Sequence, residues 1–231
     1  MEEIIQLGQL VSLGLALLLP LANPLTSMTM LLSLGGQLSH IERRRQITEA
    51  TLYVVGIMLV AYYGGSWIMQ TFSISIPSMR IAGGLIVASI GFSMLFPKSH
   101  PDTTPEADAV SLQNNARQAT NIAFVPLALP GTAGPGTIAM IISGAATLGP
   151  ATTQDYAAWV LAVAPVIVFA LLGLLFWVVL RFADRIAALL GPGGVEAIAR
   201  VMGFLLVCMA VQFVINGVLE IVDSYAATLL R

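Results

Sequence analysis

The residues best suited to bind a small solute surround two proline motifs that resemble each other. Segment 20–26 reads PLANPLT and segment 126–132 reads PLALPGT, so five of the seven positions are identical. Hydroxyl and amide groups can hold a polar solute, and glycine lets the backbone approach it closely. The candidate binding residues, all in otherwise apolar stretches, are Asn23, Pro24, Thr26, Ser27, Gly131, Thr132, Gly134, Gly136 and Thr137.

The prolines predict that both apolar stretches are broken helices. A proline removes a backbone N–H and clashes with the preceding turn, so two of them four residues apart interrupt a helix. Asn23 followed by Pro24 is typical of a helix start, with Asn as the cap. In the second stretch, the helix after the break can start at Gly134 followed by Pro135, or at segment 130–132. Two helix N-termini would then meet, each with about half a positive charge and unpaired N–H groups that favour an anion.

The missing charges narrow the solute that such a site would take. Glu49 and Glu220 lie near the ends of their apolar stretches, so no carboxylate is available in the middle for a large cation. A small zwitterion needs none, because its carboxylate can take helix N–H groups and its ammonium can take carbonyl, Asn or Thr oxygens. The alternative to a binding site is that the proline kinks in both stretches only shape the helices. The glycine-rich run 131–136 lacks the Lys and the Ser or Thr of a phosphate loop.

The composition places these motifs in a membrane. The chain has 231 residues, 57% hydrophobic and 10% charged, whereas soluble domains have about 25% charged residues. A helix needs about 20 apolar residues to cross the hydrocarbon, and no stretch has the alternation of a barrel strand. We therefore predict an all-α polytopic membrane protein with six transmembrane segments, near 7–36, 47–69, 79–97, 120–147, 156–180 and 198–222.

The basic residues predict an orientation. If the N-terminus lies outside, eight of the ten Lys and Arg residues fall on the cytoplasmic side, where such residues gather. Arg80 and Arg231 remain on the other side, so both termini are predicted to be periplasmic. A net charge of −2 without a long basic run excludes nucleic acid as a partner. The single cysteine, Cys208, excludes a disulfide and is predicted to pack inside the protein.

The repeated motifs predict two halves of inverted topology. Each half has three spans, an odd number, so the second half must enter the membrane from the opposite side, as in secondary transporters. The expected units are a three-helix repeat at 1–97, a cytoplasmic linker at 98–121 and an inverted three-helix repeat at 122–231. A second match places Arg80, Gly83, Leu85 and Val87 on Arg200, Gly203, Leu205 and Val207.

Two further features of the third and sixth spans carry predictions. The small residues Gly84, Ala88 and Gly91, and likewise Gly203, Val207 and Ala210, recur at helical spacing and predict helix contacts. Arg80 and Arg200, each in the first turn of its span, oppose the helix dipole and are expected to need a partner, and both are predicted to reach the headgroups by snorkelling.

At these motifs the chain resembles the MarC family of bacterial inner-membrane proteins, named for multiple antibiotic resistance. The resemblance covers segments 20–26, 74–94, 124–143 and 196–221. It implies the bacterial cell inner membrane and a relation to the archaeal SnatA proteins, transporters of small neutral amino acids. By that resemblance, the broken first and fourth spans form the substrate site. Leu129 stands where the first motif has Asn23, so the two half-sites differ chemically.

We therefore expect a secondary transporter of small neutral amino acids such as glycine and alanine. A drug or metabolite exporter and a non-transporting membrane scaffold are the alternatives. No Asp pair, Ser with His, or Cys pair lies in the spans, so we expect no enzyme, catalytic residue, metal or cofactor. The expected partners are the solute and the lipid bilayer. Coupling to H⁺ or Na⁺ and assembly into an oligomer are both compatible with the sequence.

Overall fold

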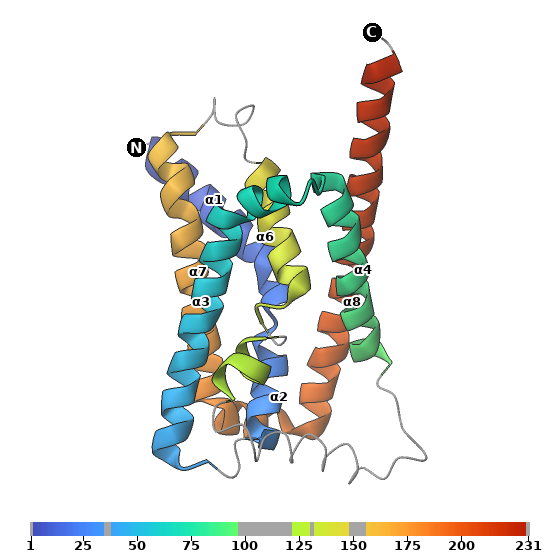
Figure 1. The fold of residues 1–231 in the computed structure, drawn as a ribbon. Coiled ribbons are helices and arrows are strands. Elements are labelled where there is room, and N and C mark those ends of the chain that lie inside the picture. Colours follow the sequence, from blue (N-terminus) through green and yellow to red (C-terminus); the bar gives the residue numbers. More distant parts are fainter. Residues whose placement is uncertain (1, 35–37, 97–121, 130–131, 148–155, 230–231) are drawn as a thin grey trace.

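The computed structural model describes residues 2–34, 38–96, 122–129, 132–147 and 156–229 (Figure 1). The predicted linker at 98–121, Gly131 and Arg231 lie outside these residues. All regular structure within the described ranges is helical, which confirms the predicted all-α class. Five helices there are long and apolar enough to cross a membrane, with Glu2–Leu34 counted as one. The protein is therefore a multi-pass helical membrane protein.

The first four helices run up and down the bundle. They are α1 (Glu2–Ala22), α2 (Pro24–Leu34), α3 (His40–Thr71) and α4 (Ile76–Leu95). Ser39 starts α3 by accepting a hydrogen bond from the Glu42 N–H at 3.2 Å, a common N-terminal capping arrangement. Ser75 caps α4 in the same way. These polar caps end the connections and set where each membrane helix begins.

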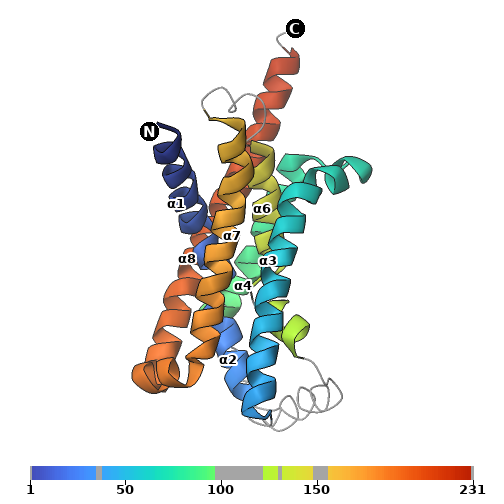
Figure 2. The same cartoon turned by 90° about the vertical axis from the view of Figure 1, so that its left-hand side faces the viewer.

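The second part of the chain contributes η2 (Ala123–Ala128), α6 (Pro135–Thr147), α7 (Ala158–Arg181) and α8 (Ala183–Leu229). The start of α1 and the end of α8 lie at the same end of the bundle, which we call the terminal end (Figure 1). The opposite end, called the loop end, holds the end of α2, the start of α3 and the turn from α7 into α8 (Figure 2). Gly191 makes a bend in α8 with φ of 64°, a conformation that glycine adopts readily.

The fourth predicted span is divided between two short elements. α6 has 13 residues, and about 20 are needed to cross the hydrocarbon, so it reaches only part of the way. η2 approaches from the loop end and α6 continues towards the terminal end (Figure 1). The first span is divided too, at Asn23 between α1 and α2. Both divisions fall at the proline motifs, as their sequences predict.

The two faces of small residues pack against each other. α4 and α8 lie side by side (Figure 1), and a Cβ added to Gly84 would stand 2.8 Å from the Ala210 carbonyl oxygen. This confirms the predicted helix contacts and shows that each face is the partner of the other. The prediction for Cys208 is wrong, because its side chain is exposed on α8. An apolar residue on an outer helix face can contact lipid and need not pack inside the protein.

The two arginines differ, and the prediction that both reach the headgroups is wrong for Arg80. Its side chain is only 13% exposed and pairs with Glu220 of α8. Arg200 pairs with Glu196 one turn away on the same helix, and its side chain is 55% exposed. An ion pair between helices can replace water around a guanidinium, whereas an exposed arginine is solvated directly.

Candidate functional site

The first helix break is a single residue. α1 ends at Ala22 and α2 begins at Pro24, so the predicted helix start at Asn23 and Pro24 is confirmed. Asn23 has φ of 21°, in a region that Asn tolerates better than most residues. Its carbonyl accepts the Thr26 N–H at 3.2 Å. In the structure the backbone, rather than the Asn23 side chain, therefore takes this first-turn N–H.

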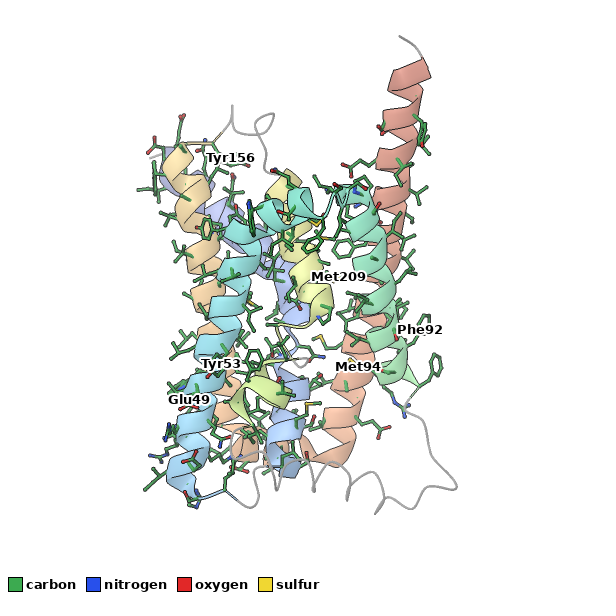
Figure 3. The ribbon with its side chains drawn as sticks, in the orientation of Figure 1. Glu49, Tyr53, Phe92, Met94, Tyr156 and Met209 are labelled. Atoms are coloured by element: carbon green, nitrogen blue, oxygen red, sulfur yellow. The ribbon has the colours of Figure 1, made fainter. Side chains whose placement is uncertain are left out.

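The Asn23 side chain turns towards α4 instead. Its Nδ2 donates to Sδ of Met94 at 3.6 Å, and the residue is 5% exposed. Met94 lies on the inner side of α4, whereas Phe92 points away from the bundle (Figure 3). The amide is therefore buried at the point where the first span breaks, beside the α4–α8 pair.

The second helix break is longer and begins within η2. The Leu127 and Leu129 N–H groups donate five residues back, to Ile122 and Phe124, so the turns of η2 are wide. Val125 within it has an extended backbone, with φ −125° and ψ 122°. α6 begins at Pro135, so of the two predicted starts the one at Gly134 and Pro135 is correct.

Buried hydroxyl groups connect the two breaks. Ser27 Oγ donates to the Leu127 carbonyl oxygen at 3.0 Å and lies 3.1 Å from Thr132 Oγ1. Thr137 Oγ1 bonds to the Thr132 carbonyl at 2.9 Å and approaches that of Leu21 at 3.5 Å. Ser27, Thr132 and Thr137 are all buried. Backbone carbonyls that lose their helical partners at the breaks thus accept hydrogen bonds from these hydroxyl groups. A buried carbonyl within a membrane needs such a donor because no water reaches it.

A cavity of about 120 Å³ lies between the breaks. Five of the predicted binding residues line it, namely Asn23, Thr26, Gly134, Gly136 and Thr137. Ser27 and Thr132 lie in the hydrogen-bonded layer that joins the breaks and do not line the cavity. Pro24 is half-buried at the start of α2 and is also absent from the lining, and Gly131 lies outside the described residues. The structure therefore brings most of the predicted residues together around one space.

Sequence reasoning missed the apolar walls of this cavity. Leu21, Met30, Val87, Ile90 and Leu206 complete its lining. Val87 also explains Gly136, because a Cβ there would stand 2.5 Å from Val87 Cγ2. These residues carry no local signal, since apolar residues are common in every span and only the packing of α1, α2, α4 and α8 selects them.

Gln46 was also missed, although it holds the second break in place. Its Oε1 accepts the Ile122 N–H at 3.0 Å, and its side chain is buried at 1% exposure. Ile122 immediately precedes η2, so a side chain of α3 binds the start of the broken fourth span. A glutamine beside three arginines offers no sign of this contact, which depends on how α3 packs against η2.

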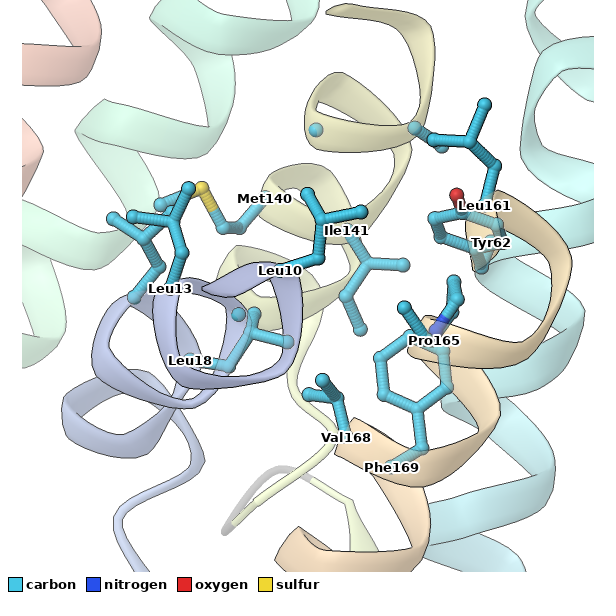
Figure 4. Close-up of a pocket in the computed structure, with 15 residues that line it drawn as sticks. Leu10, Leu13, Leu18, Tyr62, Met140, Ile141, Leu161, Pro165, Val168 and Phe169 are labelled. Carbon is cyan, nitrogen blue, oxygen red and sulfur yellow. The ribbon is translucent and has the colours of Figure 1, made fainter. Parts of the chain in front are cut away.

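A second, larger cavity of about 200 Å³ lies nearer the terminal end (Figure 4). Leu10, Leu13 and Leu18 of α1 form one wall, Met140 and Ile141 of α6 another, and residues of α7 a third. The lining is apolar apart from the edge of Tyr62. Leu18 and Met140 lie about one turn beyond Leu21 and Thr137 of the smaller cavity, so the two spaces follow each other along α1 and α6.

The fold and the site together define a class, a multi-pass membrane protein whose broken helices enclose a small cavity with a few polar groups in an apolar lining. The family model for MarC family integral membrane proteins matches residues 8–222, and the chain belongs to that family. It is 55% identical over 221 residues to the inner membrane protein MarC of Escherichia coli O1:K1, covering 96% of this chain and 99% of that protein. The MarC proteins of Escherichia coli K12 and Shigella flexneri are each 54% identical to this chain over 221 residues, again covering 96% of it and 99% of the relative. No solved structure matches the chain. It is an integral protein of the inner membrane.

Proposed function

We propose that this protein is a secondary transporter of small neutral amino acids of the size of glycine and alanine. The cavity of about 120 Å³ between the helix breaks is its solute site. One observation carries the proposal: the first turns of α2 and α6, from different halves of the chain, line the same cavity through Thr26 and Thr137. Family membership alone gives the membrane location and no substrate.

The cavity offers partners for both charges of a zwitterion. First-turn N–H groups of a helix have no partner within that helix, and the helix dipole adds partial positive charge, so the start of α6 at Gly136 and Thr137 suits a carboxylate. At the start of α2 the Thr26 N–H is already taken by the Asn23 carbonyl, so α2 contributes mainly its helix dipole. Oxygens of Asn23, Thr26 and Thr137 can accept hydrogen bonds from an ammonium. No Asp, Glu, Lys or Arg is among the described residues that line the cavity. A solute with no net charge is the best match.

The size of the cavity favours glycine and alanine over the alternatives. Sites for drug-sized ligands occupy about 300–1,000 Å³, well above the about 120 Å³ here. The Val87 and Ile90 side chains bound the space on the α4 side and leave little room for a longer solute. A drug exporter is therefore disfavoured. A scaffold does not require two broken helices around a cavity, and breaks at membrane depth are costly, so a scaffold role is also disfavoured.

The helix contacts support the inverted repeat. In an inverted repeat, α1 corresponds to η2, α2 to α6, α3 to α7, and α4 to α8, and each helix contact in one half should have a counterpart in the other. The contact of α1 with α7 corresponds to that of η2 with α3, and the contact of α2 with α8 corresponds to that of α6 with α4. All four contacts occur. The pairs α3–α7 and α4–α8 map onto themselves. We infer six spans in two inverted repeats, 1–97 and 122–231, joined by a cytoplasmic linker at 98–121.

The described basic residues support the proposed orientation. Arg43, Arg44 and Arg45 lie in the first turns of α3, and Arg181 and Arg185 flank the junction of α7 and α8, all at the loop end. Arg43 also bonds to Asp184 there at 2.9 Å. Because cytoplasmic loops collect basic residues, the loop end is assigned to the cytoplasm and both termini to the periplasm.

Uptake of labelled glycine and alanine into liposomes containing the purified protein tests this function, with imposed H⁺ or Na⁺ gradients to identify a coupling ion. Thr137→Val keeps the side-chain shape and removes the hydroxyl, so it should raise the half-saturating concentration about tenfold. Thr71→Val is the control, because the Thr71 hydroxyl bonds to Trp67 in its own exposed turn. Absence of uptake and of glycine or alanine binding by the wild type would overturn the proposal.

A further inference from the structure

Arg80 joins three helices at the terminal end of the bundle. It lies in the second turn of α4, and its Nε donates to Ser143 Oγ of α6 at 2.6 Å. Its Nη1 donates to Glu220 Oε2 of α8, also at 2.6 Å. One guanidinium therefore connects the α4–α8 pair to α6, the helix whose first turn lines the solute site.

This arrangement is unfavourable for Arg80 considered alone. A cation near the start of a helix opposes the helix dipole, and burying its charge removes water. Arg200, its counterpart in the matched segment of the other half, avoids both costs by pairing with Glu196 on its own helix in an exposed position. Ionised residues held between membrane helices generally serve function. The contrast with Arg200 indicates that the placement of Arg80 has a purpose beyond charge balance.

Apart from the bond between Arg80 and Ser143, the described contacts between α4 and α6 are made by small and apolar residues. A Cβ at Gly83 would lie 2.6 Å from Ala139 Cβ, and one at Gly136 would lie 2.5 Å from Val87 Cγ2. Contacts between such small and apolar side chains are close but not directional, so they permit sliding and tilting. The bond between Arg80 and Ser143 has a defined direction and length, and it fixes α6 against α4.

Space for movement lies on the other side of α6. Met140, Ile141, Gly144 and Ala145 of α6 face the apolar cavity of about 200 Å³, which residues of α1 and α7 also line (Figure 4). The non-helical residues 132–134 before Pro135 provide a pivot. A tilt of α6 about this pivot would move Ser143 at its far end most and would part Ala139 from Gly83 of α4, which opens the α4 side of α6 beside the solute site.

We propose that Arg80 is a positioning residue that acts as a latch on α6. Its bonds to Ser143 and Glu220 hold α6 against the α4–α8 pair, and their release lets α6 tilt towards α1 and open the solute site. The role in transport rests on the proposed function. The latch itself rests on the packing around α6.

Disulfide formation between α1 and α6 tests the latch without any solute. The protein carries Cys208→Ser with Leu13→Cys and Gly144→Cys, which replace residues on opposite walls of the apolar cavity. A Cβ added at Gly144 meets nothing within 4 Å, so this cysteine introduces no strain. A disulfide needs Cα atoms within about 7 Å, so its rate reports how often α6 approaches α1.

Ser143→Ala removes the bond to α6 and leaves the pair of Arg80 with Glu220 in place. Loss of a hydrogen bond to a charged group should raise the population of the tilted state, and hence the disulfide rate, about tenfold or more. Arg80→Gln and Glu220→Gln should act in the same direction. Arg200→Gln should leave the rate unchanged, because Arg200 contacts its own helix.

An unchanged disulfide rate in Ser143→Ala, with thermal unfolding showing a folded protein, would overturn the latch even if Arg80→Gln does not fold. Uptake separates this result from the proposed function. In a transporter, Ser143→Ala should change the maximal rate of uptake more than the half-saturating concentration. A raised disulfide rate in a protein that neither binds nor transports glycine or alanine would support the latch and refute the solute assignment.

Discussion

Gly91 and Gly203 contact each other where α4 and α8 cross. A Cβ on Gly91 would lie 2.8 Å from the Gly203 carbonyl oxygen, and one on Gly203 would lie 2.9 Å from that of Gly91. Each glycine thus meets the backbone of the opposite helix, which cannot rotate away as a side chain can. In a bilayer the lipid is as apolar as leucine, so close packing of this kind is a main source of helix association.

Gly91→Ala should therefore destabilise the protein by about 1–3 kcal/mol, because α4 and α8 must separate to admit the methyl group. The measurement is thermal unfolding in detergent. The matched control is Gly56→Ala in α3, where an added Cβ meets nothing within 4 Å and alanine should gain about 0.5–1 kcal/mol from helix propensity. Equal unfolding temperatures for the two variants would show that the α4–α8 contact is looser than described.

Asn23→Ala should lower the affinity for glycine and alanine about tenfold, because it removes one hydrogen bond to the solute and places alanine at a positive φ. Asn23→Gly removes the same amide but tolerates the positive φ, so it separates loss of binding from backbone strain. Calorimetry and thermal-shift measurements with both solutes report the two effects.

Leu129→Ala, at the matching position of the second motif, is the control for Asn23. It is half-buried and apolar, so its loss should reduce thermal stability and leave solute affinity nearly unchanged. Wild-type binding by Asn23→Ala would mean that the amide serves only the helix break and its contact with Met94.

Ser27→Ala should destabilise the protein by about 1–3 kcal/mol, since the Leu127 carbonyl loses its buried donor across the break. Ser33→Ala is the comparison, because the Ser33 hydroxyl bonds to Met30 within its own exposed turn. Chemical or thermal unfolding of both variants checks the difference. Similar stabilities would imply that the two breaks are held together mainly by their apolar neighbours.

Reporter fusions test the proposed topology. A fusion at Gln113 should give a cytoplasmic signal, and one at Arg231 should give a periplasmic signal, because the loop end carries the basic residues and the terminal end holds both termini. A periplasmic signal at Gln113 would reverse the orientation and contradict the assignment of 98–121 to the cytoplasm.

Local chemistry allowed the spans and the breaks to be predicted from the sequence. Long apolar stretches cross a bilayer whatever their neighbours, and a proline lacks its N–H wherever it stands. The starts of α2 at Pro24 and of α6 at Pro135 follow from those two facts. The small residues around Gly91 and Gly203 indicated helix contacts, because only small side chains let membrane helices approach closely.

Only the tertiary structure decided which residues meet across the chain. Arg80 and Arg200 have matching local sequences, yet Arg80 pairs with a different helix and Arg200 with its own. Gln46 binds the start of η2, and Asn23 turns to Met94, through contacts 76 and 71 positions apart. Cys208 faces outwards although it lies within an apolar span. The physical reason is the same in each case. In lipid, the inner and outer faces of a helix are equally apolar, so hydrophobicity does not choose between them, and the choice depends on how the helices pack.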